Sequence, residues 1–274
     1  MEGRVLTIAG SDSGGGAGIQ GDIKTITALG GYAASAITAL TAQNTLGVQE
    51  SVPVEALFVE RQVDAVLDDI GADAIKTGML VDQLMVEIVA RRLEAKARSV
   101  PLVIDPVMVS SSGKALLNQR GREALRRRLI PICAIVTPNI EEASVLTGIE
   151  VKDEGDMHQA ADRLLLMGAN AVLVTGGHLL SDRVVDLLRT ADGLERRFEN
   201  ERQTTSCTHG TGCTLSAAIA TGIAQGMTLE SAVERAIEFV QQAMRWAVRL
   251  GQGEHCPLDH GFQLRQRPLK EPIH

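Results

Sequence analysis

The run Val5-Leu6-Thr7-Ile8-Ala9 is followed at once by Gly10-Ser11-Asp12-Ser13-Gly14-Gly15-Gly16-Ala17-Gly18, and this change of character indicates the fold. A short aliphatic run bounded by glycine predicts a buried strand. The glycine-rich segment then predicts a loop at the carboxyl end of that strand. Ligands of open α/β sheets bind beyond the carboxyl ends of the strands. The opening of the chain therefore predicts a buried sheet with a ligand site beside it.

Further aliphatic runs of the same kind recur along the chain, at 33–40, 74–76, 102–105, 134–137 and 171–175. Amphipathic stretches separate them, most clearly 81–98 and 228–249, where Thr228 is a suitable N-cap. In 81–98 the apolar face at helical spacing contains Leu84, Met85, Ile88, Val89 and Leu93. Alternating strands and helices predict right-handed βαβ units and a mainly parallel sheet covered by helices.

Residues 182–202 break this alternation. Two strand-like runs, 183–188 and 195–199, flank Asp192-Gly193, a dipeptide typical of a hairpin turn. We expect an antiparallel pair that extends one edge of the sheet. The sequence shows no linker and no internal repeat, so we predict a single domain over residues 1–260 and a loosely held polar tail over 261–274.

The composition narrows the class of protein. A net charge of −7 with 2% aromatic residues argues against a nucleic-acid partner. No apolar run reaches the roughly 18 residues that span a bilayer, and the first residues do not resemble a signal peptide, so we expect a cytoplasmic protein with no membrane partner. The four cysteines have no metal-binding spacing, and we expect them to be reduced thiols: Cys133, Cys207, Cys213 and Cys256.

Two common phosphate-binding motifs do not fit. Residues 16–21 satisfy GxGxxG, but the glycines begin late after the strand, and no carboxylate ends the second strand to bind a ribose. The pair Gly113-Lys114 is followed by Ala115 rather than by Ser or Thr, which excludes a P-loop.

The strongest local motif is Thr208-His209-Gly210-Thr211-Gly212-Cys213-Thr214, which leads into an Ala-rich helix. Glycines at a helix start let the free N–H groups and the positive end of the dipole reach an anion. An ordinary helix start capped by Thr211 explains the same letters. Spacing alone does not decide between the two.

Seven segments, in order over about residues 4–260, together resemble the bacterial hydroxymethylpyrimidine/phosphomethylpyrimidine kinases: 6–22, 38–45, 76–80, 105–108, 137–143, 176–178 and 208–214. The resemblance implies a ribokinase-like three-layer α/β/α fold, with a mainly parallel central sheet and an antiparallel edge, in a homodimer. It also implies ATP-dependent, Mg²⁺-assisted phosphorylation of 4-amino-5-hydroxymethyl-2-methylpyrimidine, and of its monophosphate, in thiamine biosynthesis.

In the resembling family the helix start at Gly210, Thr211 and Gly212 holds the transferring phosphate, and the cysteine that corresponds to Cys213 accepts the hydroxyl proton. A thiol at a helix N-terminus has a lowered pKa, so we expect a thiolate; the alternative is an inert, buried cysteine. His209 lies one turn earlier, and a Cys–His hydrolase is a further reading. No orienting Asn or Asp is evident in the sequence beside this Cys–His pair, and a hydrolase would leave the other six motifs unexplained.

The substrate pocket implied by the resemblance contains Gln43, Met79, Gly10, Asp22 and Val107. The carboxamide of Gln43 offers one donor and one acceptor, which match the amino group and ring nitrogen of an aminopyrimidine. Met79 packs on the ring or is simply a core residue. Asp22 bonds the hydroxymethyl group or is a solvated helix charge.

The nucleotide and metal residues follow the later strands. The nucleotide site is expected at Asp105, Thr137, Asn139, Thr175, Gly177 and His209. Glu142, with Asp105, is expected to place Mg²⁺, often through water. The alternative for Glu142 is a first-turn carboxylate favoured by the helix dipole.

The sequence departs from the family pattern at four positions. Thr175 and Ile237 stand where members commonly have lysine, Cys207 where they have asparagine, and Cys256 where they have glycine. Two alternatives stay open. One is a pyridoxine/pyridoxal kinase, because the same scaffold accepts another hydroxymethyl heteroaromatic ring; the other is a non-catalytic pyrimidine-sensing module, which only the two missing lysines support.

Overall fold

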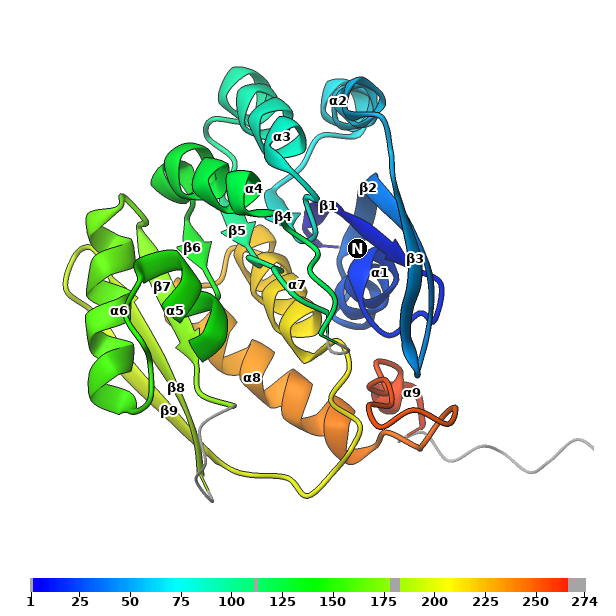
Figure 1. Cartoon of the computed structure of the whole chain (residues 1–274), viewed down its shortest axis with the longest axis vertical. Coiled ribbons are helices and arrows are strands. Elements are labelled where there is room, and N and C mark those ends of the chain that lie inside the picture. Colours follow the sequence, from blue (N-terminus) through cyan, green and yellow to red (C-terminus); the bar gives the residue numbers. More distant parts are fainter. Residues whose placement is uncertain (1, 111–112, 178–182, 266–274) are drawn as a thin grey trace, which may run out of the picture.

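A nine-stranded sheet in the order β3-β2-β1-β4-β5-β6-β7-β8-β9 forms the centre of the protein (Figure 1). The structure is a computed structural model, and it describes residues 2–110, 113–177 and 183–265. The strands are β1 (Arg4–Asp12), β2 (Tyr32–Asn44), β3 (Gly47–Pro53), β4 (Ala74–Thr77), β5 (Leu102–Ile104), β6 (Ile135–Val136), β7 (Ala171–Thr175), β8 (Arg183–Thr190) and β9 (Glu195–Glu201). The six predicted aliphatic runs are β1, β2, β4, β5, β6 and β7.

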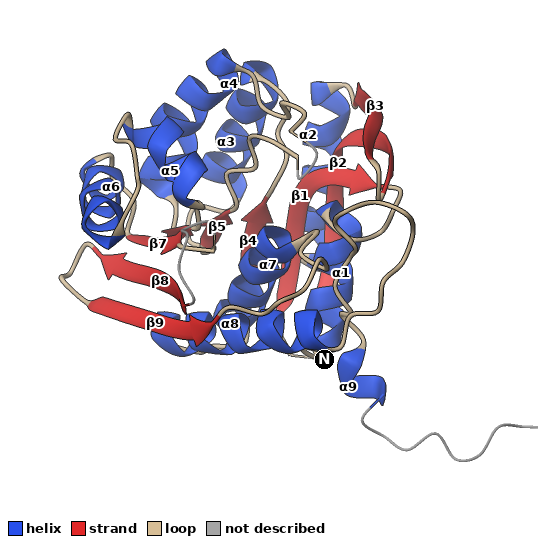
Figure 2. Ribbon diagram, turned by 60° about the horizontal axis from the view of Figure 1, so that its bottom comes forward, coloured by secondary structure: helices blue, strands red, loops and turns tan. Residues whose placement is uncertain are grey.

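Helices cover both faces of this sheet (Figure 2). They are α1 (Gly18–Ala28), α2 (Ala56–Ala65), α3 (Gln83–Lys96), α4 (Gln119–Ala124), α5 (Ile140–Thr147), α6 (Glu154–Leu166), α7 (Thr211–Ala224), α8 (Leu229–Arg245) and the short α9 (Phe262–Arg265). The predicted three-layer α/β/α architecture is confirmed.

Neighbouring strands in the run β2-β1-β4-β5-β6-β7 pair in parallel, as the βαβ alternation predicts. The hairpin expected around Asp192-Gly193 is also confirmed, since β7, β8 and β9 pair antiparallel. The prediction of one antiparallel edge was incomplete, because β3 pairs antiparallel with β2 at the other edge. The sequence of β3, GVQESVP, is short and polar and has no strand periodicity to reveal it.

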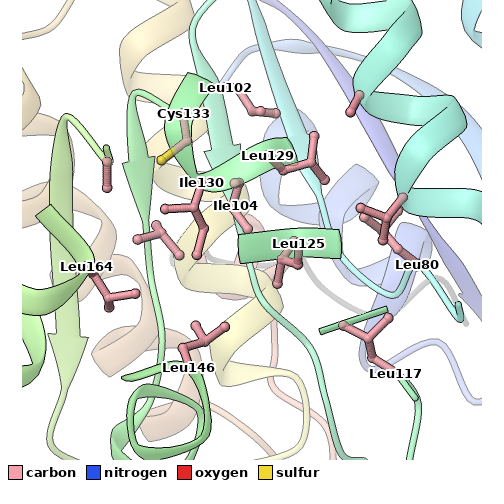
Figure 3. Close-up of a cluster of buried hydrophobic side chains, with 14 of the residues drawn as sticks. Leu80, Leu102, Ile104, Leu117, Leu125, Leu129, Ile130, Cys133, Leu146 and Leu164 are labelled. Atoms are coloured by element: carbon pink, nitrogen blue, oxygen red, sulfur yellow. The ribbon is translucent and has the colours of Figure 1, made fainter. Parts of the chain in front are cut away.

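Two apolar layers hold the helices to the sheet. Leu6 and Ile8 point to the face covered by α2 to α6, and Val5 points to the face covered by α1, α7 and α8. Successive strand residues face opposite sides, so each strand supplies both layers. Figure 3 shows the first layer, where Leu80, Leu125, Leu146 and other aliphatic side chains meet.

The helix signals were mostly right. The hydroxyl of Thr228 accepts a hydrogen bond from the backbone N–H of Ser231 at the start of α8, as the N-cap prediction requires. Leu84 was wrongly placed on the buried face of α3, since it is 60% exposed. It is the second residue of α3, two positions after the N-cap Asp82.

The expectation of four reduced cysteines was wrong. Cys207 and Cys256 form a disulfide, and Cys133 and Cys213 are free. The pair is 49 residues apart in sequence, so no local spacing could reveal it. The predicted loose tail also begins too early, because Phe262 is buried against Phe239; residues 266–274 lie outside the described residues. Within the described ranges, no helix has the length and apolar character to cross a membrane.

Candidate active site

A pocket of about 630 Å³ lies at the carboxyl ends of the parallel strands. It gathers every site residue predicted from the sequence except Asp22 and Gly177: Gly10, Gln43, Met79, Asp105, Val107, Thr137, Asn139, Glu142, Thr175, His209, Gly210, Thr211, Gly212 and Cys213. A more open hollow of about 990 Å³ over β9 and α8 is lined mainly by charged and amide side chains, and the described residues around it include none of the predicted site.

The start of α7 is shaped as an anion site. The N-cap is Gly210 rather than Thr211, with φ of 89°, so the expected alternative of a Thr211 cap is wrong. A Cβ on Gly210 would lie 2.0 Å from the carbonyl oxygen of Gly16, which makes glycine necessary there. A Cβ on Gly212 would meet its nearest atom, Asp105 Oδ1, at 3.9 Å. The helix start at Gly212 therefore leaves room for a ligand in the pocket, and free N–H groups at a helix start favour an anion there.

Cys213 lies in the pocket at this helix start, but the expected thiolate is contradicted. Burial raises the pKa of its thiol, and the carboxylates of Asp105 and Asp22 raise it further. The Lys76 ammonium and the N–H of Gly18 favour the thiolate but are outweighed. The helix-dipole argument failed because it left out the desolvation of the thiol.

Asp12, which was not predicted from the sequence, organises the glycine-rich loop after β1. Its carboxylate accepts hydrogen bonds from the N–H groups of Gly14, Gly16 and Ala17 and lies 2.9 Å from His209 Nε2. Burial alone would raise the pKa of Asp12, but His209 and the N–H groups of Ala17 and Gly14 outweigh it and lower the pKa. An acidic residue at a strand end beside three glycines was the available signal.

Gln43 lines the pocket from the tip of β2. Its Oε1 accepts a hydrogen bond of 3.2 Å from the Thr41 hydroxyl, and its Nε2 lies 3.3 Å from His209 Nε2. Met79 lies across the pocket floor, where a Cβ on Gly10 would come within 2.9 Å of its sulfur. The structure thus brings the predicted ring-binding residues together.

Asp22 does not line the pocket, so the expected contact with a hydroxymethyl group is not supported, and neither is the alternative of a solvated charge. Its carboxylate is fully buried on α1 and binds the equally buried Lys76 Nζ at 2.9 Å. Lys76 Nζ also lies 3.5 Å from Asp105 Oδ2. Burial would lower the pKa of Lys76, but Asp22 and Asp105 outweigh it and raise the pKa. Lys76 is a second residue that sequence reasoning missed.

Glu142 and Asn139 form a capping box at the start of α5. The Glu142 N–H donates to Asn139 Oδ1 at 2.8 Å, and the Asn139 N–H donates to Glu142 Oε2 at 3.1 Å. Burial raises the pKa of Glu142 to about 8, and the nearby Asp105 adds to the shift. The alternative of a first-turn carboxylate at Glu142 is therefore correct for the local structure. Glu142 also lines the pocket.

This donor set fits Mg²⁺ rather than a metal held by protein alone. No group of three or more His, Cys, Asp or Glu gathers as a metal site in the described ranges. Mg²⁺ usually takes one or two carboxylates together with phosphate oxygens and water. Asp105 and Glu142 line one pocket, and the raised pKa of Glu142 marks negative charge that a cation would neutralise.

Two positions expected near the nucleotide, Gly177 and Ile237, do not line the pocket. Gly177 lies outside the pocket, where its carbonyl accepts a hydrogen bond of 2.8 Å from Arg202; His178, from the same motif, lies outside the described residues. Ile237, at the position of the second missing lysine, is 6% exposed and packs into the layer beneath α7 and α8.

Comparison with known proteins decides the family. The phosphomethylpyrimidine kinase family model matches residues 12–259. The chain belongs to this family. Members similar to it include the hydroxymethylpyrimidine/phosphomethylpyrimidine kinase of Streptomyces coelicolor, 48% identical over 95% of both chains. The chain is also similar to the crystal structure of an ADP complex of Bacillus subtilis pyridoxal kinase, with a TM-score of 0.87 and 36% identity over 95% of this chain and 98% of that one.

Another relative is longer than this chain. The thiamine biosynthesis bifunctional protein ThiED of Geobacter sulfurreducens is 49% identical over 94% of this chain. This chain covers 52% of that protein, about half its length. The shared half is thus the kinase-family part.

Proposed function

We propose that the chain transfers the terminal phosphoryl group of ATP to 4-amino-5-hydroxymethyl-2-methylpyrimidine and then to the resulting monophosphate, in thiamine biosynthesis. The observation that carries the proposal is the open amino end of α7, where Gly210, Thr211 and Gly212 line the same pocket as Gln43 and Met79. Phosphoryl transfer depends mainly on positioning and charge stabilisation, and backbone N–H groups supply both.

In this proposal the ring of the pyrimidine packs on Met79 while Gln43 pairs with its amino group and ring nitrogen. Val107 and Gly10 complete the substrate wall, and Thr137, Asn139, Thr175 and His209 line the nucleotide side. The hydroxymethyl oxygen then faces the start of α7.

Cys213 is the proposed acceptor of the proton that leaves the attacking hydroxyl. Because the pKa of its thiol is raised, little thiolate exists near neutral pH. Its contribution to the rate should therefore lie at the low end of general-base catalysis, about a hundredfold. The second acceptor differs, since a phosphate monoester has already lost its proton above about pH 6.

We propose Mg²⁺ as the accompanying metal, held by Asp105 and Glu142 with water. When bound, it would neutralise charge on the phosphate oxygens during transfer. The ADP complex of the similar pyridoxal kinase supports nucleotide binding on this scaffold. We further propose a cytoplasmic homodimer whose substrate is a small molecule.

A pyridoxal kinase is the second candidate, favoured by the structural similarity to the Bacillus subtilis enzyme. The sensor hypothesis has weaker support, because the phosphate-binding start of α7 is intact. Steady-state assays with ATP and either the pyrimidine or pyridoxal distinguish all three. We expect a higher kcat/KM for the pyrimidine and a loss of that preference in Gln43→Ala. Binding without turnover of either substrate would support the sensor.

The two acceptors give an internal control for Cys213. In Cys213→Ala the phosphorylation of the alcohol should slow about a hundredfold, while that of the monophosphate should change little. Equal losses in both reactions would reject proton acceptance and leave Cys213 a packing residue.

A further inference from the structure

The disulfide between Cys207 and Cys256 joins two segments at the edge of the active site. Cys207 precedes the start of α7, and Cys256 lies between α8 and α9. Both residues are buried, with Cys207 4% exposed and Cys256 0% exposed. In Figure 1 the orange-to-red chain after α8 returns toward the beginning of α7.

Backbone hydrogen bonds continue the contact on either side of the disulfide. The His209 N–H donates to the Cys256 carbonyl at 3.1 Å, and the Cys256 N–H donates to the Ser206 carbonyl at 3.1 Å. His209 and Pro257 form a parallel bridge. Residues 206–209 and 256–257 therefore form a small two-stranded ribbon with the disulfide inside it.

This ribbon supports the phosphate-binding helix start and the glycine-rich loop together. A Cβ on Gly16 would come within 2.5 Å of the His209 ring and 2.8 Å of Pro257 Cβ. Next along the chain, Gly210 packs on the carbonyl of Gly16. The position of the α7 amino end thus depends on the segment that Cys256 anchors.

We propose that Cys207 and Cys256 are a reversible redox modification site that sets the affinity of the α7 amino end for nucleotide phosphate. The proposal rests on the proposed function only in placing nucleotide at that helix start. The disulfide form is pre-organised, because the S–S bond keeps the two segments together, and a reductant reaches the buried sulfurs when the ribbon opens locally. In the dithiol form the ribbon has only its backbone hydrogen bonds, and ordering it reduces the affinity.

The chemistry balances with ordinary thiol reagents. A dithiol reductant gives two electrons and two protons, which break the S–S bond and leave two thiols, while the reductant becomes a disulfide. Oxidised glutathione reverses the step through a mixed disulfide and leaves as two glutathione thiols.

The test uses the full chain, oxidised with glutathione disulfide or reduced with dithiothreitol. Calorimetry measures the Kd for ADP, and peptide mapping after alkylation reports the state of all four cysteines. We expect reduction to weaken ADP binding about three- to tenfold, and reoxidation to restore it. Cys207→Ser/Cys256→Ser should bind ADP like the reduced protein and show no response to either reagent.

Three results would overturn the proposal: no Cys207–Cys256 cross-link in the mapped oxidised protein, a cross-link that leaves the ADP Kd unchanged, or an equal redox response in the double serine variant. That last result would place the effect at Cys133 or Cys213. A redox-dependent ADP Kd without turnover of the pyrimidine would support the redox site while rejecting the proposed substrate.

Discussion

Two glycines at the start of α7 have different physical roles, although they are two residues apart. Gly210 has φ of 89° and packs on the Gly16 carbonyl, so its role is in the fold. Gly212 is in the helix, and a Cβ there would make only an ordinary contact, 3.9 Å from Asp105 Oδ1, so the fold does not require glycine and we expect its role to be the approach of an anion. The motif letters alone cannot separate the two roles.

Matched alanine variants separate them experimentally. Gly210→Ala forces a Cβ into backbone and a left-handed conformation, and should lower the free energy of unfolding by about 2 kcal/mol or more. Gly212→Ala should keep its stability, because alanine favours helix, but lose about tenfold or more in kcat/KM for ATP. Urea unfolding and steady-state kinetics of both variants check this. Full activity in Gly212→Ala would contradict the proposal that the start of α7 binds the phosphate.

Glu142 should make magnesium activation depend on pH. Its pKa is raised to about 8 by burial and by Asp105, so the carboxylate is mostly protonated at neutral pH and ionises as pH rises. Apparent Mg²⁺ affinity, measured from activity at fixed ATP, should therefore increase from pH 6 to pH 9. Glu142→Gln should weaken Mg²⁺ activation and flatten this dependence. Glu150→Gln, at an exposed carboxylate outside the pocket, is the control and should retain it.

For single residues, the sequence predicted which residues lie at the site better than it predicted their burial and ionisation. Nearly every predicted site residue lies in the pocket, because most of them follow a strand and parallel strands end at one edge of the sheet. The thiolate of Cys213 and the exposure of Asp22 were wrong, because both depend on burial by elements far away in sequence. Lys76 was missed for the same reason, since its two carboxylate partners come from α1 and the end of β5.

Among the elements, α7 is held by the segment that follows α8. His260, in that segment, is buried, and its Nε2 lies 2.9 Å from the Thr214 hydroxyl in the first turns of α7. Strands and amphipathic helices could be predicted from periodicity, whereas this segment and β3 could not. Both are short and polar, and only their tertiary partners give them a fixed conformation.

The buried His260 should make the protein less stable in mild acid. Burial lowers its pKa to about 4, against 6.5 in the unfolded chain. The unfolded state therefore binds a proton first, and up to roughly 3 kcal/mol of stability is lost as pH falls from 6.5 to 4. Urea unfolding across this range measures the loss. His260→Gln should remove most of this slope, whereas the exposed His255→Gln should retain it; equal slopes in all three proteins would contradict the assignment.

On the scale of the whole molecule, the disulfide between Cys207 and Cys256 covalently links two positions that are far apart in the sequence. It closes a loop of 49 residues that contains α7 and α8, and both helices pack on the same face of the sheet. Chain entropy predicts that such a loop stabilises the folded state by about 4 kcal/mol. The loop thus connects the stability of one entire helical layer to the redox state of two side chains.

Reduction should therefore lower the urea midpoint of the wild type but leave Cys207→Ser/Cys256→Ser unchanged. Trp246, the single tryptophan, lies directly after α8, so its fluorescence reports on the α7–α8 layer. Far-ultraviolet circular dichroism reports on the secondary structure of the whole chain. If residues 1–260 are one domain, as we predict, the two probes should give one coincident transition in both redox states. A reduced protein in which tryptophan fluorescence changes first would mean that the α7–α8 layer separates from the sheet before the rest unfolds. In that case the disulfide would be what makes the two layers unfold together.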